Sequence, residues 1–393
     1  MIGNTMKEII YAIFLSFFLC GLCGNAEAKK KKEVKKAIKR EVQTPYDKLF
    51  KGKKAFTVNG LMKMHLMAGK VYAEFPIELL NRDLALTSSI EDISDNGEGV
   101  VGQFAGRVNQ FRFTLQDSML QARLVRRYGV KNTGMGKNAD QIIERSNTPG
   151  IFQSYKILAY TPDKKAVVVD MTELFLESSR LTNPFPSYAG NSLYGFVQRI
   201  HKFQSQRSEL LGICGNDNSM SVRCNLGFNV DRLVLGSFMQ AKDVPVSVTV
   251  NKILMLLPED PMRPRLADSR IGVNAIIQTE LPDVCQGIKT YYITKRWRIE
   301  PVDEIRYKQG EMVDVKKPIV FYIDTLMPDS WIKYVKAGAE AWNAAFEKIG
   351  LRNVVRTELF PKDSSFDAGD IHNSVIRYAP SWMYYPQYSM HTD

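Results

Sequence analysis

The chain has 393 residues, 45% of them hydrophobic, and a formal net charge of +11. This length predicts two or three domains, and the composition is that of an ordinary globular protein. Most of the excess charge lies in Lys29–Arg40, which has eight Lys or Arg, one Glu and no aromatic residue that could stack on bases. A charge block of this kind is typical of a solvated tail, so we expect no nucleic-acid partner.

Residues 1–28 are predicted to be a secretory signal peptide. Lys7 supplies the charged start, Ile9–Leu22 the apolar core and Ala26-Glu27-Ala28 an A-x-A cleavage site. We therefore expect an exported protein, periplasmic or extracellular, that begins near Lys29 with a basic disordered tail over residues 29–43.

Two alternatives remain for this N-terminal segment. Its apolar run is shorter than the roughly 20 residues that a bilayer-spanning helix needs, so no stable membrane anchor is expected. A lipoprotein is the other alternative, because Cys20 and Cys23 lie at the end of the run. Neither cysteine follows the small residues that usually precede a lipidation site.

Residues 44–302 are predicted to be mostly β-structure, with a short N-terminal β domain over 44–100 and a longer β-rich domain over 101–302. Leu61–Leu66 and Val71–Phe75 are expected to form a hairpin around the turn residues between them. Further strands are predicted at Phe111–Leu115, Met119–Arg126, Tyr155–Tyr160, Ala166–Val169, Val246–Val250, Ile253–Leu257, Gly272–Thr279 and Tyr291–Ile299.

Three cysteines follow the predicted signal peptide. Cys214 and Cys224 flank a polar loop, and in an oxidising compartment the two could close it with a disulfide. The alternative is that both are free buried thiols. Cys285 has no obvious partner, and the spacing of the three does not fit a zinc site.

The last quarter of the chain has the pattern of an α/β sheet, after a polar linker at 303–317. Ile319–Ile323 is a short apolar run, predicted to be a strand buried on both faces. Trp331–Ile349 has apolar residues every three or four positions and is predicted to be one helix. Val354–Leu359 and Ser374–Tyr378 are predicted as two further strands, so the fold class is α+β.

Several apparent site motifs fail on their context. Gly97–Gly102 spells G-x-G-x-x-G, but no apolar strand precedes it and no helix follows it, so we expect a loop. Gly190–Gly195 is not a nucleophile motif. Asp367, Asp370 and His372 lie close together in a Ser- and Asp-rich loop, where solvated side chains are the favoured interpretation. The other histidines, His65, His201 and His391, are scattered, and His65 is expected to be structural.

The C-terminal pattern also carries a family resemblance. The segment P-I-V-F-Y-I-D, the helix motif G-x-E-A-W-N-x-A-F-E-K-I-G over Gly338–Gly350 and the strand N-S-V-I-R-Y resemble large secreted bacterial zinc-dependent metallopeptidases. In that family, two domains of unknown function precede a metzincin-like catalytic domain. TPYDKLF, SDNGEGVVGQ, MRPRLADSRIG and YYITKRWRIE are similar to the upstream domains.

The resemblance implies a zinc cofactor, peptide or protein substrates and peptide-bond hydrolysis in the full-length family. It places residues 318–393 in an incomplete zincin-like domain that ends before the zinc motif, since no H-E-x-x-H occurs in these 393 residues. We therefore assign no catalytic, cofactor-binding or metal-ligating residue to the chain and expect it to be inactive. The alternative is a noncatalytic exported β-rich module that binds peptide or glycan.

Overall fold

The computed structural model describes residues 43–104, 108–125, 130–133, 141, 145–178, 181–185, 197–234, 238–259, 262–282, 289–362, 366–370 and 372–380. The predicted signal peptide, most of the basic tail, Cys20 and Cys23 lie outside these residues. The chain divides into two compact units, Met1–Lys51 and Gly52–Asp393. In the described residues we find no helix long and apolar enough to cross a membrane.

The described part of the first unit contains one short helix, α2 (Pro45–Phe50). Thr44 accepts a hydrogen bond from the backbone N–H of Asp47, and the Asp47 carboxylate accepts one from the Thr44 backbone. This reciprocal capping box, with Pro45 in the first turn, explains why the helix begins at this position.

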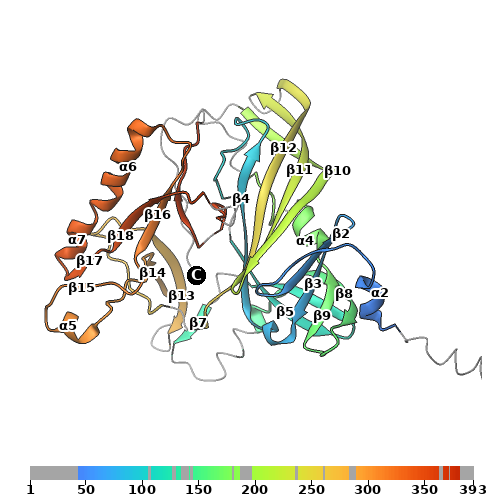
Figure 1. Ribbon diagram of the computed structural model, residues 1–393, viewed down its shortest axis with the longest axis horizontal. Coiled ribbons are helices and arrows are strands. Elements are labelled where there is room, and N and C mark those ends of the chain that lie inside the picture. The colour runs from blue at the N-terminus through green and yellow to red at the C-terminus, as the bar shows by residue number, and fades with distance from the viewer. Residues whose placement is uncertain are drawn as a thin grey trace, which may run out of the picture. The chain divides into compact units, whose positions relative to one another are not determined.

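An antiparallel sheet of eleven strands dominates the second unit (Figure 1). Its strand order is β1-β2-β3-β9-β8-β6-β5-β4-β12-β11-β10. The strands are β1 (Phe56–Val58), β2 (Lys63–Met67), β3 (Lys70–Pro76), β4 (Asp83–Ile93), β5 (Asn109–Gln116), β6 (Met119–Val125), β8 (Gly150–Tyr160), β9 (Ala166–Asp170), β10 (Val197–Asn216), β11 (Ser219–Val234) and β12 (Phe238–Leu256).

The predicted hairpin is confirmed as β2–β3, and the strands predicted at Phe111–Leu115 and Met119–Arg126 pair as β5 and β6. The β2–β3 turn is formed by Ala68 and Gly69, both with positive φ, as a tight two-residue hairpin turn requires. The two strands predicted at Val246–Val250 and Ile253–Leu257 are instead parts of one long strand, β12. That prediction was wrong because Asn251 and Lys252 are polar, yet both are fully buried within the sheet.

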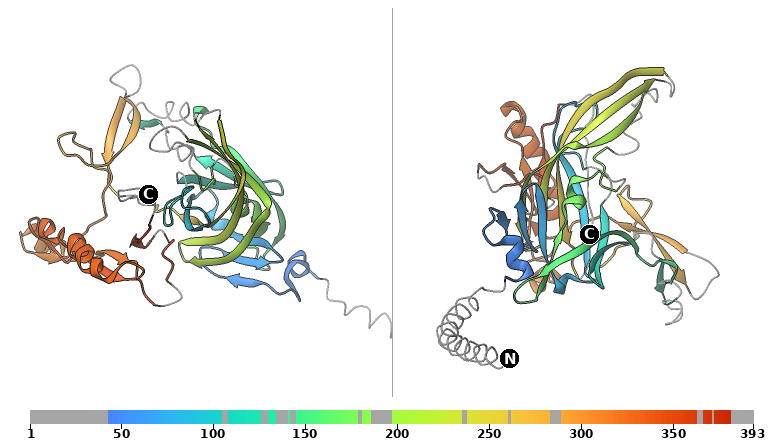
Figure 2. Two further views of the ribbon diagram at one scale, coloured as in Figure 1. Left: turned by 90° about the horizontal axis from the view of Figure 1, so that it is seen from above. Right: turned by 90° about the vertical axis from the view of Figure 1, so that its right-hand side faces the viewer.

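Two adjoining hydrophobic clusters form the core of this sheet. β11 illustrates the pattern, because Val222, Cys224, Leu226 and Phe228 alternate along the strand and are all buried. Helix α4 (Thr172–Leu176) adds Leu174 and Phe175 to the larger cluster. The long strands β10, β11 and β12 lie side by side and twist along their length (Figure 2).

A smaller sheet has the order β14-β13-β7. Its strands are β7 (Val130–Thr133), β13 (Ala275–Pro282) and β14 (Lys289–Thr294). β13 pairs antiparallel with β14 and parallel with β7. The last two strands are close to those predicted from the sequence, with boundaries that differ by a few residues.

The C-terminal region has the predicted strand, helix, strand and strand order. β16 (Ile319–Ile323) pairs in parallel with β18 (Val355–Leu359) on one side and with β19 (Ser374–Ile376) on the other. The single predicted helix is divided into α6 (Asp329–Glu340) and α7 (Asn343–Glu347). β16 is also less covered than predicted, since its three central residues are only half-buried.

The predicted linker at 303–317 is wrong. It contains α5 (Glu304–Lys308) and β15 (Val313–Asp314), and β15 pairs with β17 (Leu351–Arg352). Val313 and Val315 are buried with Ile319, Leu351, Val354 and Val355 in a third hydrophobic cluster. The segment is therefore part of the C-terminal core, because its alternate apolar residues face that cluster.

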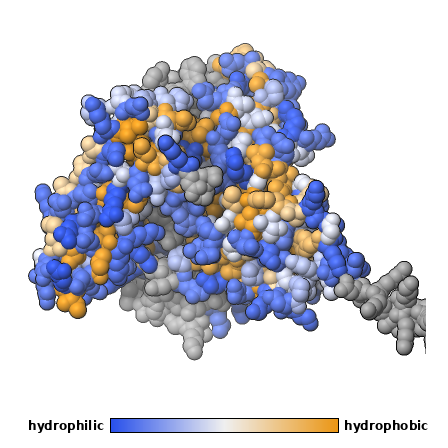
Figure 3. All heavy atoms as spheres, in the orientation of Figure 1, coloured by the Kyte–Doolittle hydropathy of each residue, from blue (hydrophilic) through white to orange (hydrophobic). Residues whose placement is uncertain are grey.

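Helix α6 covers this small sheet incompletely. Trp331 and Trp342 are 54% and 66% exposed, and Phe346 packs against the third cluster while remaining half-buried. Hydrophobic atoms are visible at the surface in the region of α6 and α7 (Figure 3). Large aromatic side chains of the predicted apolar helix face are therefore left partly exposed.

Candidate functional site

The segment Ser94–Phe104, which we call the glycine loop, folds back onto β4. The Ile90 backbone N–H donates to Gln103 O at 2.9 Å, and the Gly102 N–H donates to Ile90 O at 2.7 Å. An isolated bridge between Ser89 and Phe104 extends this pairing. The prediction that the G-x-G-x-x-G run forms a loop is confirmed.

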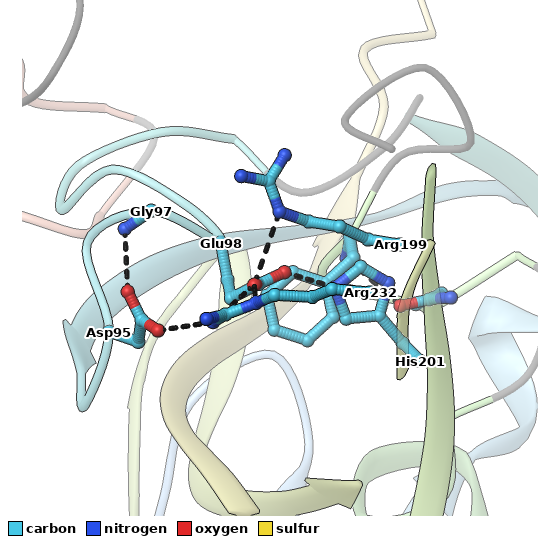
Figure 4. Close-up of polar contacts among 8 residues, drawn as sticks. Asp95, Gly97, Glu98, Arg199, His201 and Arg232 are labelled. Atoms are coloured by element: carbon cyan, nitrogen blue, oxygen red, sulfur yellow. Dashed lines mark hydrogen bonds and ion pairs between the residues drawn. The ribbon is translucent and has the colours of Figure 1, made fainter. Parts of the chain in front are cut away.

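The glycine loop places one carboxylate, that of Glu98, inside a cluster of basic side chains (Figure 4). The Glu98 side chain is completely buried. Its Oε1 accepts hydrogen bonds from Arg199 Nε at 3.2 Å and from Arg232 Nη2 at 2.8 Å. Its Oε2 lies 2.8 Å from His201 Nε2. Asp95 in the same loop accepts a second hydrogen bond from Arg232.

Strand geometry explains why these side chains converge. Arg199 and His201 are two residues apart on β10, so both point to the same face of the sheet. Arg232 on β11 is the register partner of Arg199. The His201 ring stacks on Phe185, with ring centroids 4.1 Å apart and planes 12° apart, so the imidazole is fixed from a second side.

We call Asp95, Glu98, Arg199, His201 and Arg232 the Glu98 clamp. Burial raises the pKa of Glu98, but the hydrogen bond from His201 and the charges of both guanidinium groups more than offset this, and the net shift is downward. Asp95 likewise has a lowered pKa, because a hydrogen bond from Gly97 N–H and the Arg232 guanidinium outweigh the effect of burial. Both oxygens of Glu98 are occupied, so the clamp anchors the glycine loop to the sheet.

The other histidines lie in separate places. His65 on β2 is buried, with Nε2 3.0 Å from Glu74 Oε1 and Nδ1 2.8 Å from Thr57 Oγ1, which confirms its structural role. His372 pairs with Asp370 at 2.8 Å, and this hydrogen bond raises the pKa of His372. His391 and Gly190–Gly195 lie outside the described residues.

Asp367 accepts a hydrogen bond from Asn251 Nδ2 at 3.0 Å, whereas the His372 ring is bonded to Asp370. Across the residues that the structure describes, no group of three or more His, Cys, Asp or Glu side chains could hold a metal ion. The solvated side chains favoured from the sequence are therefore not what the structure shows for Asp367, which is partly buried and bonded to the sheet.

The cysteines at 214 and 224 are free. Cys214 is exposed and opposite Ser221, whereas Cys224 is buried and opposite Leu210, so the two residues are not cross-strand partners. The Cys224 thiol donates to Phe175 O at 3.2 Å, and burial raises its pKa to about 11. The disulfide alternative is therefore not realised, and Cys285 lies outside the described residues.

One buried cation was not anticipated. Lys252 on β12 is completely buried, and its Nζ donates to Glu177 O at 2.7 Å, at the C-terminal end of helix α4. A cation at this end of a helix also meets the negative end of the helix dipole. Burial lowers the pKa of Lys252 to about 8.

The glycine loop also touches the C-terminal segment. Gly102 has a φ of +84°, and a Cβ at this position would lie 2.6 Å from Cδ of Arg377. Only glycine combines this left-handed backbone with room for the arginine. The Glu98 clamp and the Arg377 contact therefore hold two ends of the same loop.

Replacing Gly102 by Ala should disturb both the loop and Arg377. We expect the free energy of unfolding to fall by about 1–2 kcal/mol from the left-handed backbone alone, with faster amide exchange over residues 372–380. The matched control is Gly52→Ala, which has a φ of +78° but no heavy atom within 4 Å of the new Cβ. Equal exchange at 372–380 in the two variants would contradict the proposed contact.

Sequence reasoning missed the Glu98 clamp. The signals were present, because Arg199 and His201 have strand spacing and Glu98 stands between two glycines. Long strands β10 and β11 were not predicted, so the convergence of Arg199, His201 and Arg232 could not be inferred.

Two family models match the chain. Residues 43–93 match a domain of unknown function (DUF5118), and residues 102–302 match another domain of unknown function (DUF5117). The searches of curated proteins and of solved structures found no match. The glycine loop begins just after the first matched segment and overlaps the first residues of the second. Because the second match covers just over half of the sequence, the chain belongs to the family defined by the domain of unknown function DUF5117.

Proposed function

We propose that this chain is the N-terminal part of an exported zinc-dependent metallopeptidase. The observation that carries the proposal is the resemblance of the strand and helix motifs over 318–378 to the beginning of a metzincin-like domain. The parallel order β18-β16-β19, with α6 and α7 between β16 and β18, is compatible with that reading. The large antiparallel sheet would then be a noncatalytic part of the enzyme.

Two polar residues of the helix motif have a physical role that supports this reading. The Asn343 side chain donates to Val355 O and accepts from Val355 N–H, both at 2.8 Å. Glu340 accepts hydrogen bonds from the backbone and the hydroxyl of Thr357. The motif therefore fastens the helices to β18, which is a reason for these residue types at these positions.

Zinc in such an enzyme polarises the scissile carbonyl and activates a bound water. The described residues offer no group of His, Cys, Asp or Glu side chains that fits the metal. We therefore assign no step of the reaction to residues of this chain, and its contribution is to support and position the catalytic part.

A second candidate is a noncatalytic exported module that binds peptide or glycan. It is favoured by aromatic side chains at the surface, among them Tyr292, Trp297 and Trp342. Aromatic rings of this kind combine a large apolar area with a polar atom and are common in binding surfaces.

The test compares the present chain, from Lys29 onward, with the product of the complete coding sequence. We expect the chain from Lys29 to Asp393 to hold substoichiometric zinc by metal analysis and to leave a labelled protein substrate intact, because the described part has no suitable ligand set. The complete product should hold one zinc and cleave the substrate. One tightly bound zinc in the shorter chain would contradict this expectation.

Two outcomes would overturn the proposed function itself. One is a complete product that neither binds zinc nor cleaves protein, and the other is a coding sequence that stops after Asp393. Saturable binding of a glycan or peptide by that product would then favour the second candidate.

A further inference from the structure

One part of the described chain is both basic and apolar at its surface. It consists of residues 262–282 and 289–298, which include β13 and β14, and we call it the basic arm. These residues contain seven Lys or Arg and two acidic residues. Large exposed apolar patches with a polar rim mark sites of interaction with a protein or a membrane. The exposed large hydrophobic side chains of the arm are Leu266, Ile271, Val273, Ile277, Tyr292 and Trp297.

Strand pairing spreads these side chains over both faces of the arm. Tyr292 on β14 is the register partner of Ile277 on β13, so the two lie side by side on one face. The next residue, Ile293, points to the opposite face. Leu266 forms an isolated bridge with Ile293 and is 70% exposed. Within the part of the chain that the structure describes, both faces of the arm therefore present large apolar side chains to solvent.

The acidic residues of the arm do not neutralise its positive charge. Asp268 and Glu280 are each paired with a basic side chain of the arm itself. Arg263 and Arg265 are exposed, and among the described residues neither guanidinium group has a carboxylate partner. The Arg265 carbonyl accepts a hydrogen bond from the Thr294 N–H at 2.9 Å, which fixes this basic segment beside β14. A partner that complements the arm therefore carries negative charge.

We propose that the basic arm binds the surface of a lipid bilayer that contains anionic phospholipids. Clusters of Lys and Arg are attracted to the negative surface potential of such a bilayer. Aliphatic and aromatic side chains are stabilised at the boundary between the headgroups and the acyl chains. Tyr and Trp are enriched at this boundary, and the arm exposes Tyr292 and Trp297. The binding is peripheral and needs no segment that crosses the bilayer.

The kinds of exposed side chain favour a bilayer over a nucleic acid. A single-stranded nucleic acid stacks its bases on aromatic rings along a basic groove. Most of the exposed apolar side chains of the arm are instead aliphatic, and these offer no ring for stacking but gain from removal from water. Their presence on both faces also favours a fluid interface over a protein surface, which would cover one face. The aliphatic residues are Leu266, Ile271, Val273 and Ile277.

The test uses the whole chain from Lys29 and measures its cosedimentation with lipid vesicles. Vesicles that mix phosphatidylglycerol with phosphatidylcholine should bind the chain more tightly than vesicles of phosphatidylcholine alone. This difference should shrink as NaCl is added, because salt screens the attraction. Every variant keeps the basic residues of Lys29–Arg40, so a difference between variants reports on the arm. The inference does not depend on the proposed peptidase function.

The double variant Arg263→Glu and Arg265→Glu should weaken binding to the anionic vesicles at least about tenfold, because each basic residue near the surface strengthens the binding several-fold. The matched control is Lys164→Glu with Lys165→Glu, an exposed pair between β8 and β9 that undergoes the same change of charge. Equal binding by the two double variants would overturn the proposal. A double variant of the arm that loses binding to a single-stranded oligonucleotide but keeps its binding to vesicles would overturn it as well.

A fluorescence measurement tests whether the apolar side chains of the arm enter the bilayer. Tyr292→Trp should increase the quenching of tryptophan fluorescence by vesicles of brominated phosphatidylglycerol, relative to the wild type. The matched control is Tyr160→Trp on β8, because Tyr160 and Tyr292 are exposed to nearly the same extent, 49% and 53%. The control should show no such increase. Equal quenching of the two variants would show that the arm is not the part of the chain that meets the bilayer.

Discussion

Replacing Glu98 by Gln should lower the free energy of unfolding by about 3 kcal/mol at neutral pH. The variant keeps the volume of the side chain and removes the carboxylate charge that is paired with Arg199 and Arg232. Breaking one member of a buried ion cluster is costly because the remaining charges stay desolvated. Arg232 retains 25% of its side-chain exposure, so partial hydration keeps the loss near the lower end of the usual range.

Urea unfolding of the wild type and the variant at pH 7 measures this loss. Glu78→Gln is the matched control, because Glu78 is exposed and should change stability by less than about 0.5 kcal/mol. Equal midpoints for Glu98→Gln and Glu78→Gln would show that the clamp contributes nothing to stability.

The same variant should alter the acid dependence of stability. The pKa values of Glu98 and Asp95 are lowered in the folded protein, so the unfolded state binds more protons as the pH falls. Their contribution is complete above the unfolded carboxyl pKa of about 4 and is lost as the pH falls through the lower folded values. Glu98→Gln should therefore show a shallower loss of stability below about pH 4 than the wild type.

Replacing Lys252 by Met should raise the free energy of unfolding at pH 7, whereas Glu98→Gln should lower it. Burial lowers the pKa of Lys252 from 10.5 to about 8, so the folded state holds an unfavourable buried ammonium at neutral pH. The difference between the two pKa values corresponds to a destabilisation of about 3 kcal/mol by the buried charge, which the Met variant removes. The variant also loses the hydrogen bond to Glu177 O, which is worth about 1 kcal/mol and reduces the expected gain. Glu177 O keeps a second donor, Thr182 Oγ1, at 3.2 Å.

The pH dependence distinguishes this explanation from simple repacking. Between about pH 8 and 10.5 the unfolded chain holds more protons on Lys252 than the folded chain. The free energy of unfolding of the wild type should therefore receive a contribution from Lys252 that increases with pH over this range. Lys252→Met should lose that contribution, whereas Lys54→Met, at an exposed position, should retain it. Destabilisation by Lys252→Met at every pH would mean that its hydrogen bond to helix α4 outweighs the buried charge.

Local sequence patterns predicted the elements whose partners are close in the chain. The β2–β3 and β5–β6 hairpins have turn residues between alternating strands, and the β16–α6 segment has a clear apolar face. The long strands β10 and β11 escaped prediction because they have many polar residues, and strands of 20 and 16 residues exceed the usual length. Their partners are close in the chain, since β10 pairs with β11 and β11 with β12, so the missing apolar pattern and not the distance between partners hid these strands.

The Glu98 clamp escaped prediction because its members are remote in sequence. Glu98 and His201 are separated by about a hundred residues, and nothing in either local sequence specifies the partner. The error over 303–317 has a different cause. That stretch is polar at most positions, and the residues that join the core are Val313, Val315 and the half-buried Tyr307.

The pairing of β4 with β12 has a consequence for how the chain matures. Leu84 is opposite Leu256 and Ile93 is opposite Val248, so β4 acquires this neighbour only after much of the intervening polypeptide exists. At synthesis rates of about 5–20 residues per second, the edge of β4 that pairs with β12 has no strand partner for roughly 10–30 s. Such a high contact order predicts slow folding, and an apolar edge exposed for that time is prone to aggregate. Nascent chains should therefore depend on a chaperone that shields this edge until β12 emerges from the ribosome.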